Sequence, residues 1–273
     1  MIGADSVTMT SSQIFREGLL RDQVAIVTGG GTGIGKAIAL ELGRSGADLA
    51  IASRKIEHLR PAAEEIERET GRRCVFAACD IREPEQVEAF VGKVESEYGR
   101  IDVLVNNAGG QFPALAETIS VKGWNTVINN NLNGLWYMTQ AVAKRMIPRK
   151  QGRIISITAD SRGGMPGIAH SSAARAAVAN LTRTLSLEWA RHGVLVNAVA
   201  PGAVRTLGFD RAYDDETQTR SMAEAPLGRL PSPEDVAWLV TYLASPAGGF
   251  VTGQEWVLNG GHTGATWAIA KPK

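Results

Sequence analysis

The residues that most directly predict chemistry form a glycine-rich stretch, Thr28-Gly29-Gly30-Gly31-Thr32-Gly33-Ile34-Gly35. It follows the apolar run at 24–27, and Ile34, Ile38 and Leu42 then recur at helical spacing, so a strand, a turn and a helix are expected. Such a turn gathers backbone N–H groups and the positive end of a helix dipole where a pyrophosphate can approach. The stretch predicts a phosphate-bearing cofactor, and an ordinary glycine loop is the alternative.

The end of the second predicted strand indicates which dinucleotide is bound. A carboxylate usually stands there, about twenty residues after the glycines, to accept a hydrogen bond from the ribose 2′-hydroxyl. Here Ser53-Arg54-Lys55 replaces it. A hydroxyl beside a guanidinium suits a 2′-phosphate, so NADP(H) is expected; the alternative is that Arg54 and Lys55 only begin a solvated helix. Asp80 can accept from the adenine amino group, and Arg82 is either a surface charge or a second phosphate contact.

The elements that must position these residues alternate along the chain. Helical periodicity is expected at 56–69, after Pro84, and at about 122–146, 171–191 and 233–244, between apolar strands at 24–27, 48–52, 74–78, 101–105, 153–157, 194–199 and 255–258. This alternation predicts an α/β fold: a single-domain, Rossmann-type, doubly wound parallel sheet with right-handed crossovers. Residues 1–20 are expected to be an N-terminal arm. The cofactor-binding domain then covers 21–273, with a polar flap at 207–230.

Length and charge exclude several classes of protein. The chain has 273 residues, 44% of them hydrophobic, which is enough for one large core. Its 29 basic and 28 acidic side chains leave a net charge of +1, so nothing favours nucleic acid or an anionic membrane. Neither an apolar run of the ~18 residues that cross a bilayer nor an export signal is present. We expect a small-molecule substrate, no metal site, and a reducing, cytoplasmic location in which Cys74 and Cys79 are core thiols.

Four motifs in this order resemble the short-chain dehydrogenase/reductase family. They are Thr28-Gly29-x-x-x-Gly33-x-Gly35, Asn106-Asn107-Ala108-Gly109, Asn131-Leu132-Asn133-Gly134 and Pro201-Gly202-Ala203-Val204-Arg205-Thr206, and the match covers about 23–261. The resemblance implies that 107–109 border the adenosine side of the cofactor and 201–206 border the nicotinamide. The cofactor contacts expected together are Gly29, Thr32, Gly33, Ile34, Gly35, Ser53, Arg54, Asp80, Ile81, Asn107, Ala108, Gly109, Arg175, Pro201, Gly202, Val204 and Thr206.

The family's catalytic pair, a Tyr followed four residues later by a Lys, is replaced in this chain. Aligned with the family's helix, Ser171 stands at the Tyr position and Arg175 at the Lys position. The family's serine falls on Thr158 or Ala159, while Asn131 is kept. A serine hydroxyl has too high a pKa to act as a Tyr-like acid, but it can donate to an oxygen that gains charge. Arg175 stays cationic and can hold ribose hydroxyls or stabilise that charge.

These replacements favour hydride addition to a conjugated double bond over ketone reduction, because the substrate oxygen then needs only stabilisation as an enolate. Three segments, 51–55, 109–112 and 170–176, resemble peroxisomal trans-2-enoyl-CoA reductases and, more distantly, 2,4-dienoyl-CoA reductases. The dienoyl-CoA reductases draw a Tyr from the preceding loop, where Ser161 stands nearest here. The resemblance implies an NADPH-dependent reductase of an enoyl-CoA-like α,β-unsaturated substrate, with Asn131, Ser171 and Arg175 around the reacting oxygen, and a homotetramer.

Two alternatives remain open. One is an NADP-linked alcohol or aldehyde dehydrogenase of the same family, for example for a terpenoid, with a proton relay through Thr158, His170 or water. The other is a catalytically idle protein that binds NADP(H) and serves as a regulator. The first predicts NADP-linked alcohol oxidation, and the second predicts cofactor binding without turnover.

Overall fold

Seven strands form one sheet in the computed structural model, which describes residues 12, 14–212, 214–223 and 225–262. The strands pair in parallel in the order β3-β2-β1-β4-β5-β6-β7. Their bounds are β1 Val24–Thr28, β2 Asp48–Ser53, β3 Cys74–Ala78, β4 Val103–Asn106, β5 Gly152–Ile157, β6 Val194–Pro201 and β7 Glu255–Leu258. The predicted doubly wound parallel sheet is confirmed, with its strand order reversing between β1 and β4.

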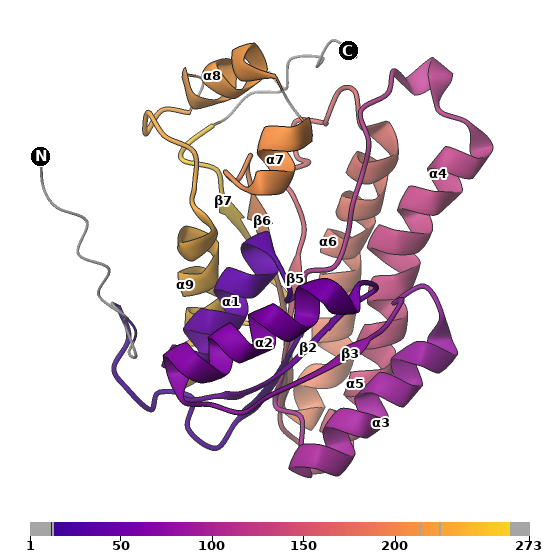
Figure 1. The fold of residues 1–273 in the computed structure, drawn as a ribbon. Coiled ribbons are helices and arrows are strands. Elements are labelled where there is room, and N and C mark those ends of the chain that lie inside the picture. The colour runs from indigo at the N-terminus through magenta and orange to yellow at the C-terminus, as the bar shows by residue number, and fades with distance from the viewer. Residues whose placement is uncertain (1–11, 13, 213, 224, 263–273) are drawn as a thin grey trace, which may run out of the picture.

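Helices cover both faces of the sheet (Figure 1). One face carries α1 (Gly33–Arg44), α2 (Ile56–Thr70) and α9 (Pro233–Ala244), and the other carries α3 (Pro84–Tyr98), α5 (Gly134–Arg149) and α6 (Ala169–Trp189). The shorter helices are α4 (Val121–Ile128), α7 (Leu207–Ala212) and α8 (Asp215–Ala223). Among the described residues, no helix is both long and apolar enough to span a bilayer.

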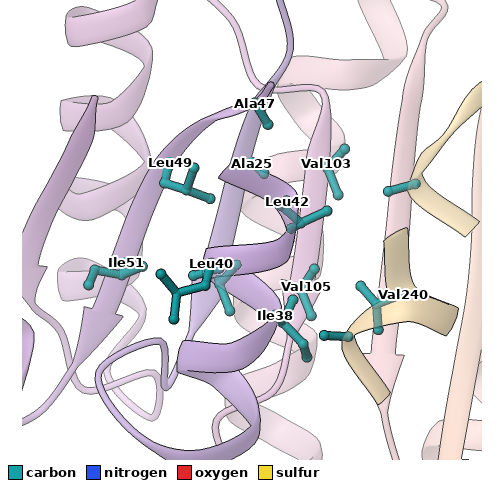
Figure 2. Packing of buried hydrophobic residues seen from close by; sticks show 14 of the residues in the cluster. Ala25, Ile38, Leu40, Leu42, Ala47, Leu49, Ile51, Val103, Val105 and Val240 are labelled. Atoms are coloured by element: carbon teal, nitrogen blue, oxygen red, sulfur yellow. The ribbon is translucent and has the colours of Figure 1, made fainter. Parts of the chain in front are cut away.

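Two apolar clusters, one on each face, hold the strands in place. In the first, Ile38 and Leu42 of α1 lie between Leu49 and Ile51 of β2 on one side and Val240 of α9 on the other (Figure 2). Burying each such side chain contributes about 1.5–3 kcal/mol. Cys74 belongs to the first cluster and Cys79 to the second; both thiols are free, and burial raises their pKa to about 12 and about 11 respectively. Both faces of the sheet are therefore covered by packed side chains.

The long helix predicted at about 122–146 is interrupted. A π-helical turn, Asn129–Asn133, separates α4 from α5. Within it the Asn131 amide donates to Val127 O over 2.9 Å and to Gly110 O over 2.7 Å. The second bond reaches a distant loop, so the extra residue in the turn serves a tertiary contact.

The expected arm and flap are described in part. Of the arm, residues 1–11 and 13 lie outside the described residues, whereas Leu20 is fully buried in the first cluster, so the chain joins the core before residue 21. The predicted flap at 207–230 contains α7 and α8, which lie together at one end of the molecule (Figure 1). Because α7 follows β6 closely, that end is the carboxyl edge of the sheet.

Candidate functional site

Two hollows adjoin at the carboxyl edge of the sheet, and Gly109 lines both. The glycine-turn hollow, of about 230 Å³, is lined by Gly29, Gly31, Thr32, Ala52, Ser53, Arg54, Lys55, His58, Cys79, Asp80, Ile81, Ala108, Gly109 and Asn130. The Arg175 hollow, of about 360 Å³, is lined by Ile34, Asn107, Gly109, Gly110, Gln111, Pro113, Ile157, Thr158, Ala159, Met165, Arg175, Pro201, Gly202, Ala203, Val204, Thr206, Gly208 and Phe209. They meet near the reversal of strand order, where ligands of such sheets bind.

The glycine turn is closed by Asn107, which explains its glycines. The Asn107 amide donates to Thr28 O over 3.0 Å, and an added Cβ at Gly29 would lie 2.8 Å from Asn107 Nδ2. At Gly35 a Cβ would lie 2.3 Å from Gly29 O, closer than any side chain tolerates. Gly29 also has a φ of +68°, which favours glycine. The turn can therefore approach a ligand with its backbone alone.

The amino end of α1 opens beside this turn. Thr32 lines the hollow as the residue before the helix, and the first turn of α1 contains no acidic side chain. Unpaired N–H groups and the helix dipole thus face the hollow with no carboxylate from that first turn to oppose them. The arrangement suits a phosphate group.

Basic side chains surround the other end of the glycine-turn hollow. Arg54, Lys55 and His58 line it and are exposed, and the Ser53 hydroxyl donates to Lys55 O over 3.1 Å in a tight turn. No carboxylate follows β2 here. His58 was not predicted; it lies in the first turn of α2, four residues after Arg54.

Asp80 also lines this hollow, but its carboxylate already has a partner. Arg82 Nε donates to Asp80 Oδ1 over 2.8 Å, and this hydrogen bond holds the pKa of Asp80 below its usual value. Asp80 is therefore ionised at neutral pH. The two roles expected for Arg82 were a surface charge and a second phosphate contact. Arg82 instead pairs with the Asp80 carboxylate and does not line the hollow, so the structure does not favour the phosphate contact.

Arg175 is the one charged side chain among the described residues that line the second hollow. Its Nη1 donates to Ile157 O over 2.7 Å, and its Nη2 packs against Gly109, where an added Cβ would lie 2.6 Å away. Burial lowers the pKa of Arg175 to about 10, so the guanidinium stays protonated at neutral pH. Its Nε is buried without a partner in the described part of the chain. The hollow therefore contains a fixed positive charge.

The other two predicted catalytic residues lie behind a loop rather than in the lining. Asn131 and Ser171 are both fully buried. Asn131 Oδ1 accepts from Gly110 N–H over 3.2 Å, while its amide donates to Gly110 O. The Ser171 hydroxyl donates to Gln111 Oε1 over 2.5 Å. Their polar groups therefore face the loop 109–112, which itself lines the hollow.

Most predicted cofactor residues do reach the two hollows. The glycine-turn hollow includes Gly29, Thr32, Ser53, Arg54, Asp80, Ile81 and Ala108, and the Arg175 hollow includes Ile34, Asn107, Arg175, Pro201, Gly202, Val204 and Thr206. Gly33 and Gly35 shape the turn without lining either. The sequence analysis missed Gln111, Met165 and Phe209 as lining residues. Gln111 lies within the segment 109–112 that carried a resemblance, and Phe209 lies on α7 within the predicted flap. Met165 comes from a loop without a sequence signal.

Comparisons with known proteins identify the family of the chain. The family profile described as Enoyl-(Acyl carrier protein) reductase matches residues 29–263. The chain is 40% identical over 258 residues to a probable 2,4-dienoyl-CoA reductase 3, (3E)-enoyl-CoA-producing, of Caenorhabditis elegans, covering 92% of this chain and 84% of the relative. It is 37% identical over 253 residues to the peroxisomal 2,4-dienoyl-CoA reductase, (3E)-enoyl-CoA-producing, of Danio rerio, with the same coverages of 92% and 84%.

A solved structure gives the same result for the fold. The citronellol catabolism dehydrogenase AtuB of Pseudomonas aeruginosa PAO1 superimposes with a TM-score of 0.81 at 39% identity, covering 94% of this chain and 99% of that one. The matched residues include the glycine turn, the loop 109–112 and Arg175. The predicted resemblance is thereby confirmed, and the chain belongs to the short-chain dehydrogenase/reductase family of oxidoreductases.

Proposed function

We propose that this protein is an NADPH-dependent reductase that saturates the double bond of an enoyl-CoA-like α,β-unsaturated thioester. One observation carries the proposal. Among the described residues that line the Arg175 hollow, the charged group is a guanidinium, and there is no Tyr, Lys, His, Cys, Asp or Glu. A site of this kind can stabilise a negative oxygen but has no acid to protonate an alkoxide. The reduction of a conjugated thioester needs the negative oxygen to be stabilised but not to be protonated.

The residues of the glycine-turn hollow support NADP(H) as the cofactor. This family uses a nicotinamide cofactor. The glycine cradle and the start of α1 suit the pyrophosphate, while Ser53, Arg54 and Lys55 suit a 2′-phosphate. His58 adds a third basic side chain at the same place. A carboxylate that would hold a 2′-hydroxyl instead does not follow β2.

When bound, NADPH supplies the hydride that adds to the β-carbon of the substrate. As electron density moves to the thioester oxygen, Arg175 stabilises the enolate with its buried positive charge. Loop 109–112 orients the reacting group. Water supplies the proton at the α-carbon, so the side chains need not transfer one. Met165, Val204 and Phe209 give the hollow apolar walls that suit an acyl chain.

The experiment measures loss of NADPH absorbance by the purified protein with four substrates of one chain length. These are trans-2-octenoyl-CoA, trans,trans-2,4-octadienoyl-CoA, octanal and 2-octanone, and cofactor affinity is titrated alongside. Turnover of the thioesters alone supports the proposal. Turnover of the aldehyde or ketone alone contradicts it, and NADPH binding without any turnover favours the idle regulator.

A second candidate, an NADP-linked alcohol or aldehyde dehydrogenase, is favoured by a different observation. Thr158 lines the Arg175 hollow, and its hydroxyl lies 3.1 Å from Glu255 Oε1. Burial raises the pKa of Glu255, which suits a proton acceptor. His170, the other relay candidate, is fully buried against Phe112 and does not line the hollow. Oxidation of 1-octanol by NADP⁺ that is lost in Glu255→Gln would support this function.

Two further properties stay predictions. Large apolar side chains at Leu187 and Phe250 are exposed in the single chain, which supports the expected homotetramer. Sedimentation equilibrium tests the assembly, with Leu187→Asp as the variant that should dissociate it. The cytoplasmic location is tested by fractionating cells that express the protein.

A further inference from the structure

The sheet ends at β3 on one side, and a groove of about 500 Å³ follows this outer edge. The groove lies between α2 and α3, which cover opposite faces of the sheet (Figure 1). It is lined by the strand itself, by Ile56 of α2, and by Lys93 and Glu97 of α3. None of these residues lines the glycine-turn hollow or the Arg175 hollow. The groove is therefore separate from the site described above.

Alternate residues of β3 direct their backbone groups into this groove. At one end of the strand, Leu49 N–H donates to Arg73 O over 2.8 Å. At the other end, Cys79 N–H donates to Ser53 O over 2.9 Å. The odd-numbered residues of 73–79 thus turn their backbone towards β2, and the even-numbered residues turn N–H and C=O groups outwards. Such a row of outward groups can pair with another strand.

Two charged side chains occupy this edge, one on a donor and one on an acceptor. Glu67 Oε1, from α2, accepts from Cys74 N–H over 3.0 Å. Lys93 Nζ, from α3, donates to Phe76 O over 3.2 Å. Both side chains are exposed, so they cover the edge from the solvent side. Charged side chains on an edge strand, lysine above all, prevent another strand from pairing there.

The outward groups of β3 are complementary to the same edge of a second copy of the chain. In an antiparallel pair centred on Phe76, that residue lies opposite its equivalent, and Cys74 lies opposite Ala78. Each outward N–H then meets an outward C=O of the other copy, as in an isologous contact. The groups required include the N–H of Cys74 and the C=O of Phe76, which are already bonded. We propose that Glu67 and Lys93 block the pairing of two copies through β3.

This pairing would link assemblies instead of closing one. The homotetramer proposed above is supported by exposed apolar side chains on other elements, Leu187 on α6 and Phe250 between α9 and β7. An additional isologous contact at β3 would join each assembly to the next in an open chain. Lys93 opposes it in a second way, because the two-fold pair would bring the ammonium groups of both copies to the same pair of Phe76 residues.

The test is sedimentation velocity of the full chain as the wild type and as Glu67→Met/Lys93→Met. Methionine has a similar length but no charge and only a weakly accepting sulfur. The control, Glu64→Met/Lys144→Met, removes the same charges from exposed side chains of α2 and α5. At high protein concentration the Glu67→Met/Lys93→Met variant should have at least about twice the weight-average mass of the wild type, whereas the control should match the wild type. Urea unfolding checks that each variant is folded, and the single variants are used if the double variant is not.

Two further variants separate pairing through β3 from non-specific association. Ala78→Pro removes an outward N–H and no bond to β2, so in the double variant it should restore the wild-type mass. Lys93→Arg keeps a donor for Phe76 O and should sediment as the wild type does.

Either of two results overturns the proposal. If removing both charges leaves the mass unchanged at every concentration, Glu67 and Lys93 are only surface charges. If association persists with Ala78→Pro, it occurs through another surface. Neither result depends on the substrate or the cofactor proposed above, because the measurement uses no ligand.

Discussion

The two hollows meet at Gly109 but are constructed differently. In the glycine-turn hollow, the groups that can bind a ligand face it directly: backbone N–H groups at the start of α1 and exposed side chains such as Arg54. Beside the Arg175 hollow, the polar residues predicted to be catalytic, Asn131 and Ser171, are fully buried and bond to a loop. The loop, not these two side chains, lines that hollow.

The difference follows from what each ligand requires. A phosphate has several equivalent oxygens, so donors and positive charge from many directions hold it. A single carbonyl oxygen needs a donor at one defined position, and a loop reaches such precision only when buried partners fix it. Mutations in the two hollows should therefore separate cofactor binding from turnover.

The largest effect is expected for Gly35→Ala, which should distort the glycine-turn hollow. The added Cβ would lie 2.3 Å from Gly29 O and 2.5 Å from Asn107 Nδ2, so the backbone must shift. We expect the free energy of unfolding to fall by about 3 kcal/mol and NADPH binding to be lost. Urea unfolding and NADPH fluorescence titration measure the two effects.

Gly92→Ala is the matched control, because a Cβ there meets nothing within 4 Å in the middle of α3. It should leave NADPH binding unchanged and raise the free energy of unfolding by about 1 kcal/mol, since alanine favours helix. Wild-type affinity in Gly35→Ala would show that the closed turn does not depend on glycine.

Asn131→Ala acts on the Arg175 hollow and should lower kcat while leaving NADPH binding almost unchanged. It removes both hydrogen bonds to Gly110 and the bond to Val127 O, so we expect about 1–3 kcal/mol less stability. Because the loop loses its position, kcat should fall about 100-fold while NADPH affinity changes little. Steady-state kinetics and fluorescence titration measure the split.

Asn133→Ala, in the same π-helical turn, is the control. Among the residues that the structure describes, its half-buried side-chain amide bonds Asn129 Oδ1 alone, so kcat should stay near that of the wild type. If Asn131→Ala weakened NADPH binding as strongly as it lowered kcat, the loop would serve both hollows and the contrast between them would fail.

The two hollows also differ in how much of their structure could be predicted from the sequence. Apolar runs and a glycine turn are local patterns, so the doubly wound parallel sheet and the place of Gly29 and Arg54 in the lining of the first hollow could be predicted from them. The π-helical turn depends on Asn131 meeting Gly110, 21 residues away. The Ser171–Gln111 bond joins residues 60 apart. Periodicity carries no information on such pairs, so the orientation of the predicted catalytic residues could not be predicted.

A smaller effect is expected for Arg54→Ala. If Arg54 holds the 2′-phosphate, loss of a charge-assisted hydrogen bond should weaken NADPH binding about 10- to 100-fold and leave NADH binding unchanged. Arg68→Ala, on the helix α2 that follows Arg54, is the control, because Arg68 is exposed and does not line the hollow. Equal loss of affinity for both cofactors would argue against a 2′-phosphate contact.

The smallest effect concerns two Asp-x-Arg pairs, one beside each hollow. Asp80 is held ionised by Arg82, which lowers the pKa of its carboxyl. For Asp160, burial raises the pKa, but hydrogen bonds from Arg162 and Asn259 outweigh it and lower the pKa overall. Both carboxylates therefore add stability that is fully present above the unfolded value of 3.8 and is lost as the pH falls below it.

Asp80→Asn and Asp160→Asn should each lower the free energy of unfolding by about 1 kcal/mol near neutral pH. The difference from the wild type should shrink as the pH falls towards about 3, which urea unfolding at several pH values measures. Asp80 lines the glycine-turn hollow, whereas Asp160 lines neither, so only Asp80→Asn should also change NADPH affinity. A change in affinity from Asp160→Asn would mean that the edge of the Arg175 hollow also helps to bind the cofactor.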